Sequence, residues 1–211
     1  MSEARDQIFA ALDAAATPLA TKTAAEPFLL PPMPDQPEAI FRARIEQAGG
    51  QFEVHRDGRW TEGQGWPLPP AEAEHLFSEC DGLPSRGLGS QVTRSDRFLD
   101  DFKNKGLRRL EPLEICVLEG QLGVVENGAV WHIPTSPAVR AAALLAEHLV
   151  IVLRAEALVP TLHQAYDQID LGPSPFGWFL CGPSKTADIE QALVFGAHGA
   201  KTMRLVLTQG I

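Results

Sequence analysis

One short tract of the chain combines glycine, hydroxyl, basic and acidic residues in an order suited to holding an anion. It follows an apolar run from Phe176 to Leu180 that predicts a strand, and it leads into a predicted helix from Ala187 to Phe195. Free amides at a helix N-terminus, the positive end of the helix dipole and a nearby ammonium group together favour a phosphate or carboxylate. The candidate anion-binding residues are Gly182, Ser184, Lys185, Thr186 and Asp188.

The same tract also has a purely structural interpretation. Ser184 or Thr186 could cap the helix with its hydroxyl group, while Asp188 in the first turn offsets the helix dipole. The tract lacks the spacing of a Walker A loop and that of the Gly-x-Gly-x-x-Gly dinucleotide motif. Neither ATP nor NAD is therefore indicated, and no cofactor is expected.

A second glycine-flanked turn follows this tract and contains His198, with Gly199 directly after it. A histidine in such a turn could carry a proton near neutral pH, because its ordinary pKa lies close to 6.5. The alternative is a residue that only ends the preceding helix. His198 is therefore a candidate catalytic residue.

The elements that must position these residues alternate between helical and extended patterns. Helices are predicted over residues 37–48, 68–80, 137–147 and 159–168, and strands over 51–55, 149–153 and 203–207. An Asn127-Gly128 turn between two β-prone arms predicts a hairpin over 123–131. Unbroken apolar strands alternating with helices indicate an α/β fold with a sheet covered on both faces.

The first 37 residues differ from the rest of the chain. Residues 4–16 have the spacing of a short amphipathic helix, and six prolines between positions 17 and 37 exclude a helix interior or a central strand. We therefore expect an N-terminal helix and Pro-rich arm over 1–37, and a single α/β domain over 38–211. The arm could pack on its own domain or on a neighbouring subunit.

Composition narrows the possible partners. The chain has 211 residues and a formal net charge of -9, which argues against non-specific binding to nucleic acid. Its three cysteines form neither a metal-binding motif nor an even disulfide framework, so we expect no metal site and a reduced, cytoplasmic protein. The start lacks the pattern of a signal peptide, and no apolar stretch is long enough for a membrane span.

The tract from Gly182 to Glu190, followed by Gly-x-His-Gly around His198 and an apolar final strand, resembles the C-terminal signature of the lactate utilization protein C family, which carries a LUD domain. The resemblance extends more loosely over residues 85–211. It implies a three-layer α/β/α sandwich similar to that of sugar-phosphate isomerases and CoA transferases. It also implies a role in bacterial oxidation of L-lactate to pyruvate, together with iron–sulfur partner proteins.

Three functions are compatible with this resemblance. The first is a ligand-binding or accessory subunit of L-lactate oxidation that binds a small anionic ligand. The second is a free-standing enzyme of the CoA-transferase or sugar-phosphate-isomerase type, in which Glu126 or His198 acts in acid–base or nucleophilic catalysis and Lys185 captures the anion. The third is a small-molecule sensor. Glu126 is also compatible with an exposed hairpin residue that has no catalytic role.

Overall fold

A computed structural model of the chain describes residues 7, 9–11, 29–56, 76–80, 102–104, 113–172, 176–189, 192–195 and 199–209. In residues 186–189 and 192–195 it describes the backbone only. The chain divides into two units, Met1–Leu30 and Pro31–Ile211. The second unit contains every strand and long helix discussed below.

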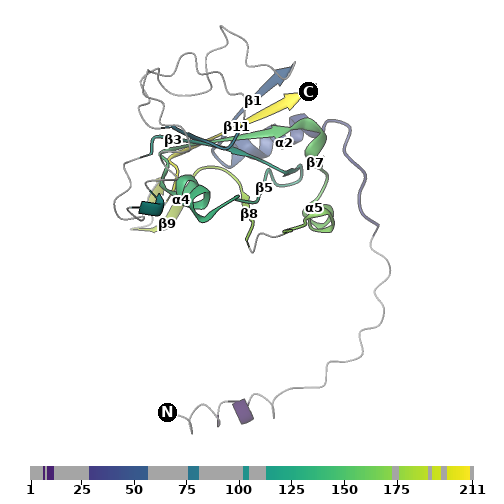
Figure 1. The fold of residues 1–211 in the computed structure, drawn as a ribbon. Coiled ribbons are helices and arrows are strands. Elements are labelled where there is room, and N and C mark those ends of the chain that lie inside the picture. Colours follow the sequence, from purple (N-terminus) through teal and green to yellow (C-terminus); the bar gives the residue numbers. More distant parts are fainter. Residues whose placement is uncertain are drawn as a thin grey trace. The chain divides into compact units, whose positions relative to one another are not determined.

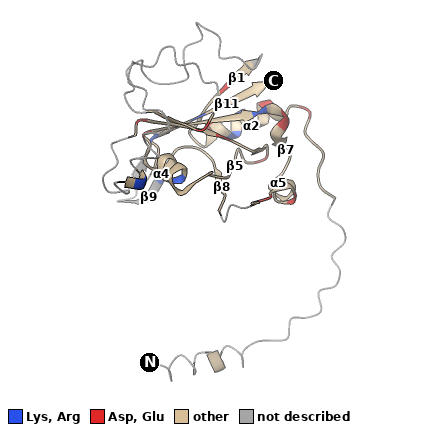
Figure 2. Ribbon diagram, viewed as in Figure 1, with Lys and Arg blue, Asp and Glu red and all other residues tan. Residues whose placement is uncertain are grey.

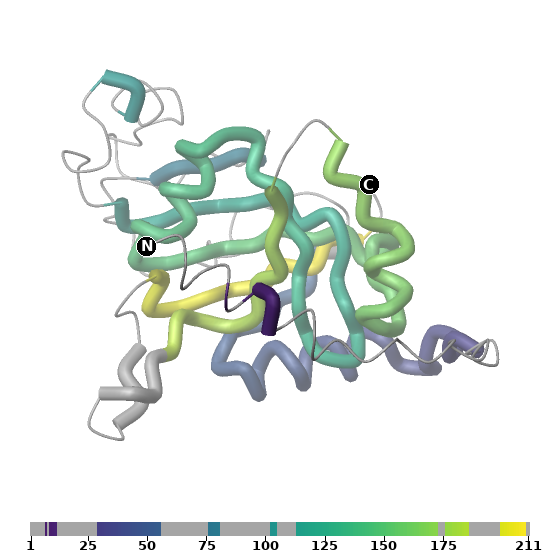
Figure 3. Tube along the Cα trace, turned by 90° about the horizontal axis from the view of Figure 1, so that it is seen from below, coloured from purple at the N-terminus to yellow at the C-terminus, as the bar shows by residue number. Residues whose placement is uncertain are grey.

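A five-stranded parallel sheet forms the centre of this unit (Figure 1). Its order is β1-β11-β6-β3-β2, and the strands lie side by side in this order in Figure 3. Their bounds are β1 (Gln51–Arg56), β2 (Leu76–Ser78), β3 (Ile115–Glu119), β6 (His148–Arg154) and β11 (Thr202–Gln209). The central strands β3, β6 and β11 are largely buried, which explains their nearly unbroken apolar sequences.

Two helices cover one face of this sheet, α2 (Pro37–Gln47) and α4 (Pro137–Leu145). Phe41 and Ile45 of α2 lie four residues apart, so both point to the same side and are fully buried. In α4 small alanines allow a close approach to the core, and the hydroxyl oxygen of Ser136 caps the helix by accepting from Val139 N at 3.3 Å. The two helices share one hydrophobic cluster with β3, β6 and β11.

A smaller sheet lies on the same side as these helices (Figure 1). It consists of β4 (Leu122–Val124), β5 (Val130–His132), β7 (Leu158–Val159) and β8 (Trp178–Leu180), in the order β7-β4-β5-β8. A short 3-10 turn, η2 (Ala155–Ala157), and helix α5 (Leu162–Gln168) complete this part. A Cβ atom on Gly123 would lie 2.5 Å from the side chain of Leu153, so glycine permits the two sheets to approach closely.

Most elements agree with the sequence predictions. The α/β class is confirmed, as are the helices at 37–48 and 137–147, the hairpin around Asn127-Gly128 and the strands at 51–55, 149–153 and 203–207. The helix predicted over 159–168 is shorter, because β7 precedes it. The small mixed sheet as a whole was not foreseen, since its pairing joins segments far apart in the sequence.

Two predicted helices were wrong over the residues described. Residues 187–189 and 192–195 do not form a helix but belong to an antiparallel pair of strands, β9 (Lys185–Ile189) and β10 (Ala192–Phe195). In place of the end of the helix over 68–80, residues 76–78 form strand β2, which pairs in parallel with β3. Short apolar runs carry no reliable periodicity, so strand pairing with a neighbour decides their conformation.

Candidate functional site

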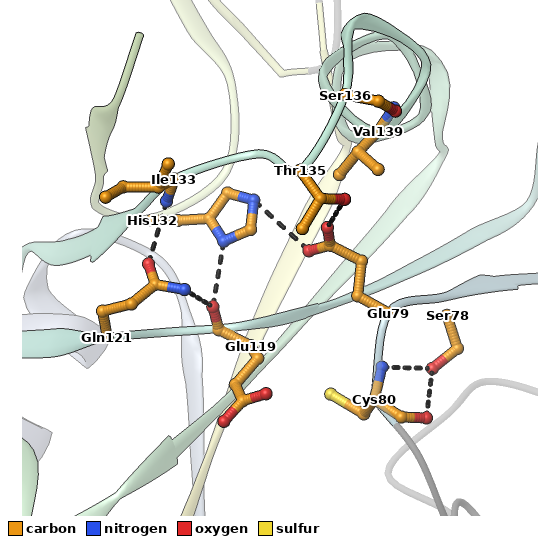
Figure 4. Close-up of polar contacts among 10 residues, drawn as sticks. All are labelled: Ser78, Glu79, Cys80, Glu119, Gln121, His132, Ile133, Thr135, Ser136 and Val139. Carbon is orange, nitrogen blue, oxygen red and sulfur yellow. Dashed lines mark hydrogen bonds and ion pairs between the residues drawn. The ribbon is translucent and has the colours of Figure 1, made fainter. Parts of the chain in front are cut away.

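A cluster of polar residues lies at the carboxyl edge of the parallel sheet, where ligand sites of open α/β sheets commonly lie, and the side chains of Glu79 and His132 in it are largely buried. Glu79 comes directly after β2, Glu119 ends β3, and His132 ends β5 of the smaller sheet. Figure 4 shows the side chain of Glu79 and the imidazole of His132 pointing toward each other. The two sheets therefore bring together residues that are 53 positions apart, from 79 to 132.

The imidazole of His132 is oriented by the main chain of Glu119. Nδ1 lies 2.9 Å from Glu119 O, and that oxygen also accepts from Gln121 Nε2 at 3.0 Å. Because a carbonyl oxygen can only accept, this contact places a proton on Nδ1 of His132. In the neutral imidazole, Nε2 is then an acceptor without a proton.

The carboxyl group of Glu79 faces this second nitrogen. Its Oε2 lies 3.4 Å from His132 Nε2, while Oε1 accepts from Thr135 Oγ1 at 3.0 Å (Figure 4). The side chains are 11% and 1% exposed, respectively, and Nε2 has no hydrogen bond of good geometry within the described residues. Burial raises the pKa of Glu79 and lowers the pKa of His132. Both shifts favour the uncharged forms, a protonated Glu79 carboxyl group and a neutral His132 imidazole.

A cavity of about 690 Å³ adjoins this cluster through Thr135. Its walls come from the connection between β5 and α4, from the start of α4, and from the segment between α5 and β8. The lining residues are Ile133, Pro134, Thr135, Ser136, Pro137, Arg140, Asp170, Leu171, Gly172 and Phe176. A cavity of this size, mainly apolar with a few polar groups, is typical of a small-molecule site.

Arg140 supplies the positive charge of this cavity. It lies in the first turn of α4 and is the only charged residue of that helix, seen as the blue segment of α4 in Figure 2. Its guanidinium carbon lies 4.8 Å from the ring centre of Phe176, a cation–π contact that helps to hold the side chain in place. Trp178 contacts Phe176 edge to face, and its ring centre lies 5.4 Å from that of Phe176 and 6.4 Å from that of His132.

The predicted anion-binding loop lies elsewhere and has a different environment. The Lys185 ammonium would be 3.5 Å from a Cβ on Gly49, directly after the C-terminal end of α2. Gly182 has a φ of 72° and packs against Ala48, and Ser184 N donates to Ala200 O at 2.9 Å. Because residues 185–189 form a strand, Lys185 stands near the negative end of a helix dipole, without the helix N-terminus expected from the sequence.

Glu126, the one remaining predicted site residue whose side chain is described, is not brought together with the Glu79–His132 cluster. Glu126 is exposed, and its carboxylate accepts from Leu162 N at 2.8 Å, which caps the N-terminus of α5. His198 lies outside the described residues, and so do the side chains of Thr186 and Asp188. The binding and catalytic roles assigned to these residues stay predictions.

The cluster itself was missed by sequence reasoning. Glu79 fell inside a predicted helix, where an acidic residue carries no signal, and His132 belongs to no metal-binding or catalytic motif. Arg140 looked like an ordinary charged residue of an alanine-rich helix. The one usable signal was that Glu119 ends a buried strand, because polar residues at the carboxyl ends of parallel strands are often functional.

Comparison with known proteins identifies the family. The model of the LUD domain matches residues 91–208, more than half of the chain. The chain belongs to the LUD domain family. Glu119, His132 and Arg140 lie within the matched residues of this domain, whereas Glu79 precedes them.

Curated relatives of this LUD domain protein are moderately similar. It is 29% identical to Lactate utilization protein C of Shouchella clausii over 54% of this chain and 52% of the relative. The same identity holds for the uncharacterized protein YkgG of Escherichia coli, over 64% and 56%, and for Lactate utilization protein C of Bacillus licheniformis, over 77% and 64%. The chain thus spans between half and two thirds of the length of these relatives.

A solved structure supports the fold. A DUF162 family protein from Deinococcus radiodurans superimposes with a TM-score of 0.57 at 16% sequence identity, covering 82% of this chain and 96% of the other. At this identity the likeness concerns the fold alone.

Among the described residues, no helix is long and apolar enough to cross a membrane. The described part of the chain also contains no group of three or more His, Cys, Asp or Glu placed to hold a metal ion.

Proposed function

We propose that this protein takes part in lactate utilization, as a ligand-binding subunit that supports the oxidation of L-lactate to pyruvate by iron–sulfur partner proteins. The observation that carries the proposal is the match to the LUD domain together with the similarity to two proteins named Lactate utilization protein C. The residues matched by the LUD domain, 91–208, include β3, the hairpin of β4 and β5, and α4, whereas β2 lies outside them.

The geometry supports a ligand-binding role more than a redox role. A cavity with one guanidinium group and mostly apolar walls can hold an organic anion, and none of its described lining residues carries a thiol or an imidazole group. Electron transfer from lactate requires an oxidant, which the partner proteins would supply in this proposal. The protein would then bind a reactant or help to assemble the complex.

This proposal is tested by deletion and co-purification. Cells that lack the protein should grow poorly with L-lactate as the carbon source and normally with pyruvate, and re-expression of the full chain should restore growth. Tagged protein from lactate-grown cells should co-purify with iron–sulfur proteins, and lactate-dependent electron transfer in the extract should depend on it. Normal growth on lactate combined with no such partners would refute the proposal.

A free-standing acyl-transfer or isomerase activity is the second candidate. The observation that favours it is the Glu79–His132 pair, which places a carboxyl group and an imidazole 3.4 Å apart beside a cavity. Turnover of acyl-CoA or sugar-phosphate substrates by the isolated chain would support this candidate. If Glu79→Gln left such turnover unchanged, the pair would have no part in it.

The Lys185 loop is tested separately by Lys185→Ala, with Lys103→Ala as a control at another exposed lysine. If the loop binds an anion, the affinity for inorganic phosphate or L-lactate should fall, because the ammonium charge is removed. The thermal unfolding midpoint should stay within a few degrees, since an exposed lysine contributes little to stability. Unchanged affinity with a clearly lower midpoint would show a structural role only.

A further inference from the structure

The wall of the cavity at the start of α4 is electropositive. Arg140 is the only basic residue among the described residues that line the cavity, and Ser136 and Pro137 place the N-terminus of the helix at the same wall. The N-terminal end of a helix dipole carries a partial positive charge. The guanidinium group and the helix end therefore favour the same kind of ligand group, an anion.

The guanidinium of Arg140 is held in place and still has donors to offer. Its guanidinium carbon lies over the ring of Phe176, 4.8 Å from the ring centre. A carboxylate can accept from two guanidinium N–H groups at once, so it is the anion that Arg140 binds most favourably. Within the part of the chain that the structure describes, no carboxylate is paired with this side chain.

The rest of the cavity is mainly apolar. Ile133, Pro134, Leu171 and the ring of Phe176 form its walls, so they would contact hydrocarbon parts of a ligand. Asp170, the one acidic residue among the described residues of the lining, already accepts a hydrogen bond from Gly172 N at 2.8 Å and stabilises the turn there. Cavities of about 300–1,000 Å³ accommodate ligands of drug size. At about 690 Å³ this one is larger than a three-carbon acid requires.

We propose that this cavity binds an amphipathic monocarboxylate, whose carboxylate pairs with Arg140 and whose apolar body contacts Phe176 and Leu171. The inference deepens the ligand-binding role proposed above and rests on it for its biological meaning. Its test uses the purified chain alone, so it can fail or succeed independently of any lactate phenotype.

The test is a calorimetric titration of the full chain with octanoate, a carboxylate with an apolar tail. Octanoate should bind, and Arg140→Gln should weaken its affinity roughly 10-fold, because a charge-assisted hydrogen bond is lost. Arg140→Lys should retain part of the affinity, since it keeps the charge without the planar fork. Arg154→Gln, at an exposed arginine outside the cavity lining, should bind octanoate like the unaltered protein.

Two further comparisons sharpen the result. Octylamine and L-lactate should bind more weakly than octanoate, because the first has the wrong charge and the second lacks an apolar body. Asp170→Asn should bind octanoate more tightly, since it removes a negative charge from the cavity while its amide oxygen can still accept from Gly172 N.

Several outcomes would overturn the inference. These are no binding of octanoate at millimolar concentration, equal affinity in Arg140→Gln and the unaltered protein, or equal binding of octanoate and octylamine. Binding of L-lactate as tight as that of octanoate would also overturn it, because the apolar body would then contribute nothing. Normal octanoate binding in a protein whose deletion leaves growth on lactate unaffected, and which co-purifies with no iron–sulfur proteins, would refute the proposed function and leave this site intact.

Discussion

At the scale of single residues, the contact between His132 and Glu119 decides where a proton resides. Glu119 O requires the proton on Nδ1, so Nε2 of the neutral ring can only accept. An ionised Glu79 facing an unprotonated Nε2 would be unfavourable, because two acceptors would meet. A proton on Glu79 Oε2 or on His132 Nε2 removes this conflict, in line with the raised pKa of the buried Glu79. Such a pair is suited to donating or accepting a proton beside the cavity.

The pKa shifts of this pair predict how stability depends on pH. Burial lowers the pKa of His132 below 6.5, so on acidification the unfolded chain takes up a proton before the folded chain does. His132 therefore destabilises the protein as pH falls below 6.5. Replacing it by asparagine, whose amide can still donate to Glu119 O, should make the free energy of unfolding fall less between about pH 7 and about pH 5. Urea unfolding at each pH measures this.

The change His163→Asn is the matched control, because His163 is exposed on α5 and lies outside the cluster. It should leave the pH dependence of the unaltered protein in place. Glu79 changes the stability in the opposite direction with pH. Because its pKa is raised in the folded protein, the free energy of unfolding falls as pH rises from 4.5 toward the pKa of Glu79 in the folded protein. Glu79→Gln should remove that loss. Identical pH profiles for His132→Asn and the unaltered protein would contradict a buried, neutral imidazole.

At the scale of elements, α5 depends on a cap supplied from the hairpin. The carboxylate of Glu126 accepts from Leu162 N at the first turn of this helix. Loss of a capping acceptor costs about 1 kcal/mol, so Glu126→Ala should lower the free energy of unfolding by this amount. Glu126→Gln should lose less, because its amide oxygen can still accept.

Glu156→Ala provides the comparison, since Glu156 is exposed in η2, and it should change stability by no more than about 0.5 kcal/mol. Chemical denaturation of the four proteins checks the order. If Glu126→Gln kept full stability but abolished turnover of a substrate, Glu126 would be catalytic as the sequence suggested. Full activity in that variant would leave it with the capping role alone.

The loop before β9 requires glycine at position 182 for two reasons. Its φ is 72°, a conformation that costs other residues about 1–2 kcal/mol, and a Cβ there would lie 2.5 Å from Ala48 O. Gly172 has a φ of 51° but nothing within 4 Å of an added Cβ. Gly182→Ala should therefore destabilise the protein clearly more than Gly172→Ala, measured by thermal unfolding. Equal losses would show that the contact with α2 relaxes without cost.

At the scale of the whole molecule, the compact unit that contains the sheets begins at Pro31, and the boundary expected from the sequence stays a prediction. The predicted boundary lies between residues 37 and 38, but Gln164 Nε2 of α5 donates to Pro31 O at 3.2 Å and Pro31 belongs to the larger unit. A chain that lacks residues 1–30 should unfold within a few degrees of the full chain. Removing residues 1–36 should lower the free energy of unfolding by about 1 kcal/mol more than removing residues 1–30. The hydrogen bond to Pro31 O and the one from Ile40 N to Gln36 O, at the start of α2, are then both lost. Equal unfolding midpoints for the two shortened chains would support the sequence boundary.

The sequence by itself determined the elements whose patterns are long or locally marked. The unbroken apolar runs of β6 and β11 predict strands that are buried on both faces. The Asn127-Gly128 turn predicts a hairpin, and the spacing of Phe41 and Ile45 predicts the buried side of α2. These features depend on residues close together in the chain. They were sufficient for the α/β class and for a resemblance to the right family.

Only the tertiary structure decided what the elements bring together. Leu76–Ser78 becomes a strand because β3 offers it partners, and Lys185–Ile189 becomes one because it pairs with Ala192–Phe195. The candidate site follows from such pairings: Glu79 meets His132 because two sheets converge at the carboxyl edge, and Arg140 completes a cavity with a segment beyond α5. Contacts between distant segments leave no local pattern, so spacing along the chain could not reveal them.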